Sequence, residues 1–173
     1  MREMRCWFAA VAGASAGSIT APLIAAGLTP EEVDDQTECA LAKVRTGLWR
    51  GIWRLREHGG FYPSGTLEGW LEALLLTRIG REGPPDPKKR VTFSELYAAT
   101  GIELNVVAAD LSRQRQIVFS HHDTPECAVA EAGAASSAIP FAFPSRVLAV
   151  PEKRGATGFV HHTIVDGGVW ANF

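Results

Sequence analysis

Ser15 has the clearest chemical setting in this sequence, because it lies between Gly13 and Gly17 in a Gly-x-Ser-x-Gly pentapeptide. Between a strand and a helix, this pattern is typical of a nucleophile elbow, a tight turn that pushes the serine oxygen into the open. The two glycines would leave room for the strained turn and for close helix packing. The amide of Ala16, with the helix N-terminus, could face a developing oxyanion. The same five residues also fit a plain helix start built from small side chains.

The glycine spacing allows two nucleotide-binding alternatives. The turn resembles the glycine turn of short-chain dehydrogenases, but Ser18 and Ile19 stand where the third glycine is expected. The Tyr-x-x-x-Lys pattern of that class is also absent, because neither Tyr62 nor Tyr97 has a lysine four places later. A phosphate-binding P-loop would end in Gly-Lys-Ser/Thr, which this stretch lacks. The sequence therefore favours a serine nucleophile over a nucleotide site.

A histidine could complete an ordinary catalytic triad with this serine. Ser15, Asp110 and either His161 or His162 follow the order Ser, Asp, His that α/β-hydrolases use. The two histidines lie in a predicted strand, in which neighbouring side chains point to opposite faces, and this placement weakens the triad. It remains an alternative.

The sequence predicts no metal site. Cys6, Cys39 and Cys127 are too few and too scattered for a disulfide framework or a zinc cluster, so we expect buried thiols. Adjacent histidines seldom bind one ion, and nothing else at ligand spacing accompanies the His-His-Asp run at 121–123. We expect a solvated turn there.

The elements that must position Ser15 alternate between strands and helices. Strands are predicted at 7–12, 104–109, 116–120 and 159–165, and helices at 19–26, 30–44, 46–61, 66–79 and 126–137, with a further short helix capped by Thr92-Phe-Ser-Glu95. This alternation predicts an α/β fold with a mostly parallel sheet and helices on both faces. Ligands of such sheets bind beyond the carboxyl ends of the strands, where Ser15 and Asp166 are both placed.

Composition predicts one ordinary globular domain. The chain has 173 residues, 46% of them apolar, and its 17 basic side chains nearly balance 19 acidic ones. This balance does not indicate a nucleic-acid partner. No stretch is long and apolar enough to span a membrane, so lipid contact would be peripheral. Arg2 and Arg5 before an apolar run imitate a signal peptide, but the run also fits a buried strand, and we expect a cytoplasmic or peripheral membrane protein.

Three motifs in order carry a family resemblance over essentially the whole chain. They are Gly13-Ala-Ser-Ala-Gly17, Ser136-Ser-Ala-Ile-Pro140 and Asp166-Gly-Gly168. Together they resemble the patatin-like phospholipase family. The resemblance implies a three-layer α/β/α domain that hydrolyses acyl esters of lipids or phospholipids without a metal or organic cofactor. It also implies a catalytic dyad of Ser15 as nucleophile and Asp166 as base, with Gly167 allowing the backbone to bend beside it.

The implied dyad is chemically reasonable. A serine hydroxyl is too weakly acidic to attack an ester unaided, so a carboxylate must take its proton and return it to the leaving alcohol. An aspartate with its usual pKa near about 4 is a poor base at neutral pH, so it must be held against the serine and partly desolvated. Without the other two motifs, Asp166-Gly-Gly168 would fit a simple turn.

The sequence departs from the family pattern at both ends. The family usually carries a Gly-Gly-Gly-x-Arg/Lys-Gly oxyanion loop before the nucleophile and further chain after its Asp-Gly-Gly segment. The sequence therefore predicts one patatin-like domain, 1–173, that lacks the oxyanion loop and the C-terminal end. A catalytically silent homologue that binds lipid or protein is the alternative to a lipid acyl hydrolase, and a Ser-His-Asp esterase is the alternative enzyme.

Overall fold

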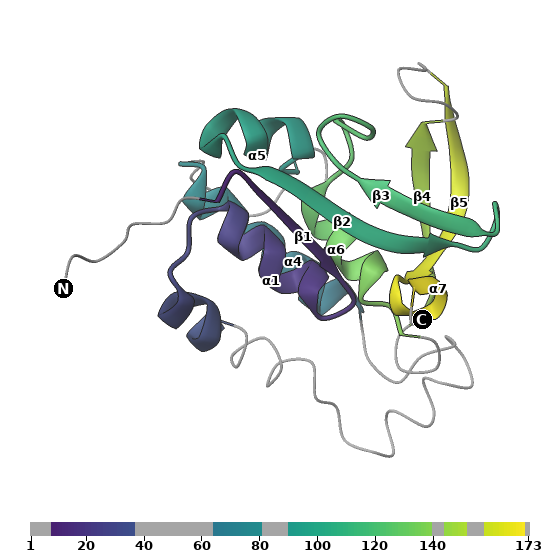
Figure 1. Ribbon diagram of the computed structural model, residues 1–173, viewed down its shortest axis with the longest axis horizontal. Helices are drawn as coiled ribbons and strands as arrows, with labels where there is room; N and C mark the ends of the chain where they lie inside the picture. Colours follow the sequence, from purple (N-terminus) through teal and green to yellow (C-terminus); the bar gives the residue numbers. More distant parts are fainter. Residues whose placement is uncertain (1–7, 37–63, 81–89, 140–143, 152–157, 172–173) are drawn as a thin grey trace, which may run out of the picture.

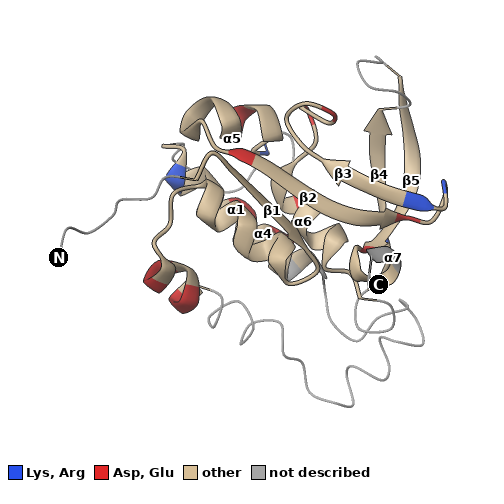
Figure 2. Cartoon of the chain, in the orientation of Figure 1, with Lys and Arg blue, Asp and Glu red and all other residues tan. Residues whose placement is uncertain are grey.

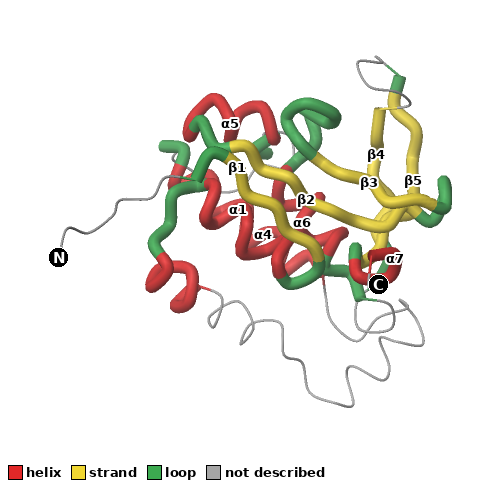
Figure 3. The backbone as a smooth tube through the Cα atoms, in the orientation of Figure 1, coloured by secondary structure: helices red, strands yellow, loops and turns green. Residues whose placement is uncertain are grey.

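A computed structural model describes residues 8–36, 64–80, 90–139, 144–151 and 158–171. Its five strands are β1 (Ala10–Ala14), β2 (Glu103–Asp110), β3 (Arg115–Phe119), β4 (Arg146–Pro151) and β5 (Phe159–Asp166). The labelled helices are α1 (Gly17–Ala25), α4 (Ser64–Arg78), α5 (Phe93–Thr100), α6 (Val129–Ser136) and α7 (Gly168–Ala171). Figure 1 shows α1, α4 and α6 gathered beside the sheet, and Figure 3 separates strands from helices by colour. The expected α/β class, a central sheet flanked by helices, is confirmed.

The sheet is mixed, which corrects the expectation of mostly parallel strands. In the described residues only β1 and β2 are parallel, whereas β2 with β3, β2 with β5 and β4 with β5 are antiparallel. Parallel neighbours need a long crossover, usually a helix, but a short turn suffices for antiparallel ones. The turn between β2 and β3 is such a connection, in which Arg113 N donates to Asp110 Oδ1 at 3.1 Å. The strand β4 was not predicted from the sequence.

Two strands share one edge of β2. The antiparallel partner β3 occupies one edge from Val106 to Asp110, so β1 and β5 must both use the other edge. Along that edge Ala14 is paired with Val107, and Asp166 is paired with the next residue, Ala108. The carboxyl ends of β1 and β5 therefore meet head to head.

One face of the sheet carries most of the core. Leu104, Val106 and Ala108 alternate along β2 and are buried, whereas Asn105 and Val107 on the opposite face are only partly buried. Helices α1 and α6 contact the sheet, and α4 packs on α6 and α1. Burial of these apolar side chains fixes which face of β2 points inward, because a shift of one residue would turn them all outward.

Helix ends follow the predicted capping signals. Thr92 and Glu95 form the expected capping box at the start of α5, since each side chain accepts a hydrogen bond from the other residue's backbone amide. Residues 30–36 are helical. Thr29, just before this helix, and Glu32, within it, form a second capping box, since each side chain accepts a hydrogen bond from the other residue's backbone amide. Gly27 has φ of +82°, as a left-handed helix terminator requires. The remainder of the predicted helix 30–44 and all of 46–61 lie outside the described residues.

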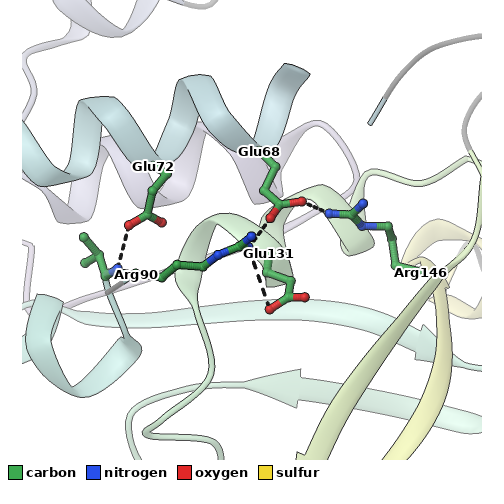
Figure 4. Close-up of polar contacts among 6 residues, drawn as sticks. Glu68, Glu72, Arg90, Glu131 and Arg146 are labelled. Atoms are coloured by element: carbon green, nitrogen blue, oxygen red, sulfur yellow. Dashed lines mark hydrogen bonds and ion pairs between the residues drawn. The ribbon is translucent and has the colours of Figure 1, made fainter. Parts of the chain in front are cut away.

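A cluster of charged side chains ties α4 to the strand β4 and to α6. Glu68 forms ion pairs with Arg90 and Arg146, and Arg90 also lies 3.9 Å from Glu131 (Figure 4). Nearby, Glu72 Oε1 accepts a hydrogen bond from the backbone amide of Val91 at 2.7 Å. Glu68 is buried, so these partners offset the cost of removing its carboxylate from water. The cluster thereby anchors the β4–β5 pair, whose second strand ends at Asp166.

Charge and hydropathy add two observations. Figure 2 shows acidic and basic residues dispersed over the described elements. Among the described residues, no helix combines the length and apolar composition that crossing a membrane requires.

Candidate active site

Ser15 and Asp166 lie in hydrogen-bond contact. The Ser15 hydroxyl donates to Asp166 Oδ2 at 2.6 Å, although the residues are 151 positions apart in the chain. Asp166 is only 4% exposed, whereas Ser15 is partly exposed. A hydroxyl that donates to a buried carboxylate and remains open to one side has the geometry of a nucleophile held against a base.

Ser15 occupies a strained turn between β1 and α1. Its φ is +52°, a left-handed conformation that is uncommon for a residue other than glycine. A Cβ atom at Gly13 would lie 2.0 Å from the carbonyl oxygen of Gly17, so the turn requires glycine there. The Ser18 hydroxyl donates to the Ser15 carbonyl at 2.6 Å and to the Gly133 carbonyl at 2.9 Å. These contacts fix the backbone of Ser15 against α1 and α6.

Gly17 differs from Gly13 in its surroundings. A Cβ atom at Gly17 would meet nothing within 4 Å, and no positive φ is recorded for it. The expectation that Gly17 provides room for close helix packing is wrong, because the tight approach involves the Gly17 carbonyl oxygen and not its missing side chain.

Asp166 is oriented by the backbone that follows it. Its Oδ1 accepts a hydrogen bond from the amide of Gly168 at 2.6 Å, which leaves Oδ2 for the serine. A Cβ atom at Gly167 would lie 2.5 Å from the Val107 carbonyl oxygen, and one at Gly168 would lie 2.9 Å from Asp166 Oδ1. Both glycines of the Asp-Gly-Gly motif are thus sterically required for this carboxylate geometry.

Ser136 connects the two halves of the site. Its hydroxyl accepts from the Ser15 amide at 3.3 Å and donates to the Val107 carbonyl at 2.6 Å. Its own carbonyl accepts from the Gly167 amide at 3.3 Å. The sequence showed Ser136 as part of a family motif, but without a reference fold nothing distinguished it from Ser137, whose hydroxyl bonds only locally, to the Ala134 carbonyl at 3.2 Å.

The N-terminus of α1 lies next to Ser15 in the chain. Ala16, which precedes the helix, has helical angles of −55° and −35°, and α1 receives no side-chain cap there. The first amides of a helix lack intrahelical partners and carry partial positive charge. Ala16, the residue predicted to supply an oxyanion amide, therefore lies at the N-terminus of α1.

Asp110 and His162 form a separate buried pair. His162 Nδ1 lies 3.1 Å from Asp110 Oδ2, and both side chains are almost fully buried. His162 lies four residues before Asp166 on β5, a separation of roughly 13 Å along a strand. Its Nε2 atom has no hydrogen-bond partner among the described residues, and the Ser15 hydroxyl bonds to Asp166. The contacts therefore do not join Ser15, Asp110 and His162 into a triad.

The fold and the site together define an α/β domain with a serine–carboxylate pair at the meeting point of two strand ends. The chain belongs to the patatin-like phospholipase family, whose model matches residues 3–173. The resemblance inferred from the three motifs is therefore confirmed.

The chain is similar to a curated protein, "Probable lipid hydrolase 463L" of Invertebrate iridescent virus 6. The two are 27% identical over 169 residues, which cover 93% of this chain and 50% of the relative. The chain thus spans about half the length of that relative.

Two solved structures are also similar. VipD from Legionella pneumophila is 18% identical with a TM-score of 0.48, and the match covers 92% of this chain and 40% of that one. A chain in the structure of SpcU with ExoU, from the type III secretion system of Pseudomonas aeruginosa, is 22% identical with a TM-score of 0.49. That match covers 78% of this chain and 32% of the other.

Proposed function

We propose that this domain hydrolyses acyl esters of lipids through a dyad of Ser15 and Asp166. The observation that carries the proposal is the 2.6 Å hydrogen bond from the Ser15 hydroxyl to Asp166 Oδ2, made at a strained turn and beside a helix N-terminus. Family membership supports ester hydrolysis, and the relative described as a probable lipid hydrolase supports a lipid substrate.

The first half of the reaction forms an acyl-enzyme. Ser15 Oγ attacks the ester carbonyl carbon while its proton moves to Asp166 Oδ2, which gives a tetrahedral intermediate with a negatively charged oxygen. The amide of Ala16 and the positive end of the α1 helix dipole stabilise its charge. As the intermediate collapses, the bond to the alkoxy oxygen breaks, and Asp166 returns the proton to the leaving alcohol.

The second half releases the acid. Asp166, again ionised, takes a proton from a water molecule as the water oxygen attacks the acyl carbon attached to Ser15. Collapse of the second intermediate breaks the bond to Ser15 Oγ, and the proton held by Asp166 returns to the serine. The products are a carboxylic acid and the regenerated hydroxyl, so no redox change or cofactor enters the cycle.

Orientation of Asp166 matters because the carboxylate must serve in both halves. The Gly168 amide holds Oδ1 at 2.6 Å, so the side chain keeps Oδ2 toward Ser15 throughout. Ser136 holds the amide of Ser15 and the backbone after Asp166 in one network. A residue that positions both partners of a dyad limits the rearrangement needed at the moment of reaction.

A fluorophosphonate probe tests the proposal, since it reacts covalently with activated serines. Wild type, Ser15→Ala, Asp166→Asn and His162→Ala are treated in parallel, after melting curves establish that each is folded. We expect labelling of wild type and of His162→Ala, and loss of labelling in the other two. Loss of labelling in His162→Ala, with labelling kept in Asp166→Asn, would instead support a Ser-His-Asp esterase. A folded wild-type protein that is not labelled would support the silent, binding-only alternative.

A further inference from the structure

Three side chains that could bind a metal ion, from two parts of the chain, lie near one another at the opposite end of β2 from Ala108 and Asp110. Glu103 is the first residue of β2, and His121 and His122 lie in the turn after β3. One ligand atom from each residue lies within 4.8 Å of the other two. A solvated turn was expected here, because adjacent histidines seldom bind one ion and no further ligand lies at ligand spacing in the sequence. The fold brings Glu103 close to the two histidines.

The turn that carries the histidines is held by buried hydroxyl groups. Ser120 and Thr124 are 2% and 3% exposed. Thr124 Oγ1 accepts from the Ser120 amide at 3.0 Å and donates to the Ser120 carbonyl at 3.2 Å. The imidazole of His121 is stacked on Tyr97 of α5, with 3.8 Å between ring centroids and an angle of 7°. The position of His121 is thus set before any ligand binds.

The side chains of Glu103, His121 and His122 lie close together, but no hydrogen bond among them is observed in the described residues. His122 Nε2 and Glu103 Oε1 are 4.0 Å apart, which is too long for a hydrogen bond. His121 Nδ1 is buried and has no hydrogen-bond partner among the described residues. The two imidazole rings lie with their centroids 3.7 Å apart. Two imidazoles and a carboxylate whose ligand atoms lie near one another, with a gap between them, are suited to an intervening cation.

We propose that Glu103, His121 and His122 form a binding site for one divalent transition metal ion of the Zn²⁺ type. Imidazole nitrogens with one carboxylate suit Zn²⁺, and three protein ligands leave a fourth position for water. Zn–N and Zn–O bonds are about 2.0–2.2 Å long, so the ligand atoms of a tetrahedral site are roughly 3.4 Å apart. The ligand atoms of the three residues lie within 4.8 Å of one another.

The surroundings of the ligands support this assignment. Asn105 Nδ2 donates to Glu103 Oε1 at 3.3 Å, the kind of contact that orients a metal-binding carboxylate. His122 is exposed and also lines a cavity of about 720 Å³ together with His161, so an ion can enter from solvent. Glu103 is paired with Ala10 at the beginning of β1, whereas Ser15 follows its end. The ion would therefore cross-link β2 and the turn after β3 at a distance from the serine.

Zn²⁺ titration of metal-free protein, followed by calorimetry, tests the site. We expect saturable binding of one ion, and a loss of at least about 100-fold in affinity for His122→Ala and for Glu103→Gln, because each removes a ligand. Asn105→Ala should weaken binding by about 10- to 100-fold, the usual effect of losing a group that orients a ligand. The matched control is His161→Ala, an exposed histidine outside the cluster, which should bind Zn²⁺ as wild type does.

Co²⁺ provides a second readout that does not depend on catalysis. Bound at this site it should give visible absorption of a tetrahedral nitrogen and oxygen environment, without the thiolate charge-transfer band that a cysteine ligand would add. Melting curves of the metal-free variants establish that they fold. The proposal is overturned if folded wild type binds no Zn²⁺ at a single saturable site, if the Glu103 and His122 variants bind as wild type, or if a thiolate band appears.

Discussion

Ala14 and Asp166 end their strands at adjacent positions along one edge of β2. Ala14 is paired with Val107 and Asp166 with Ala108, from strands that run in opposite directions. The chain after Ala14 must turn away immediately, since β5 occupies the rest of that edge. This forced turn places the next residue, Ser15, beside the Asp166 carboxylate. The mixed sheet is therefore the direct cause of the contact.

Asp166→Asn should abolish most of the proposed activity while the fold is kept. Asparagine can still accept the hydrogen bond from the Ser15 hydroxyl, but it cannot take a proton. General bases typically contribute about 10²- to 10⁴-fold, so kcat/KM for a p-nitrophenyl ester should fall by that factor. Asp110→Asn is the matched control, because Asp110 pairs with His162 and not with Ser15. Equal loss in both variants at matched folded fractions would contradict the dyad.

Gly13→Ala and Gly17→Ala should have opposite effects on stability. The methyl group at Gly13 would lie 2.0 Å from a backbone oxygen, and such overpacking typically costs about 1–3 kcal/mol of unfolding free energy. The methyl group at Gly17 would meet nothing within 4 Å, and alanine is favoured over glycine in helices by up to about 1 kcal/mol. Urea unfolding of the two variants measures both. A Gly13→Ala protein as stable as wild type would show that the elbow can relax.

Ser136→Ala should impair stability and catalysis together. It removes the acceptor for the Ser15 amide and the donor to the Val107 carbonyl, which are partly buried, and a fully buried polar group left unsatisfied would cost about 1–3 kcal/mol. Ser137→Ala removes only a local bond to Ala134 and should change the unfolding free energy far less. If Ser136 positions the dyad, its alanine variant should also react more slowly with the fluorophosphonate probe at temperatures where it is fully folded. Unchanged labelling would restrict Ser136 to a structural role.

Much of the local structure could be predicted from the sequence because it depends on short-range chemistry. The capping box at Thr92, the terminating glycine at position 27 and the alternating apolar residues of β2 all act within a few residues. The elbow around Ser15 was predicted for the same reason: glycine is the residue that fits against the Gly17 carbonyl oxygen.

The pairing of strands that are distant in the chain was harder to predict from the sequence. The strand β4 was missed, and the direction of β5 was misjudged, because hydrophobic periodicity indicates a strand without indicating its neighbour. The pairing of Asp166 with Ser15 came from family resemblance and not from spacing. The approach of Glu103 to His121 and His122 could not be predicted locally, since it depends on how the turn after β3 folds back toward the start of β2.

Glu68→Gln should destabilise the protein by about 3 kcal/mol. Glu68 is buried and forms ion pairs with both Arg90 and Arg146, so its loss reduces the compensation of two charges at a buried site. Burial also lowers the pKa of Arg146, because desolvation disfavours its charged form. Arg78→Ala removes an ion pair with Glu32 in which both side chains are more exposed, and it should have a much smaller effect. Equal melting temperatures for the two variants would show that the Glu68 cluster contributes no more than a surface pair.

Cys127 should remain unreactive in the folded protein and should make stability fall at high pH. Burial, reinforced by the negative charge of Glu131, raises the pKa of this thiol from 9.0 to about 12. Between these values the unfolded chain loses the thiol proton and the folded one keeps it, so ionisation stabilises the unfolded state. The unfolding free energy of wild type should therefore decrease as pH rises from 9.0 towards about 12, and this component should be absent in Cys127→Ala.

In a Cys6→Ser, Cys39→Ser background, iodoacetamide at pH 8 should modify Cys127 only after unfolding, because the thiolate is the reacting species. Rapid modification of the folded protein would contradict the raised pKa.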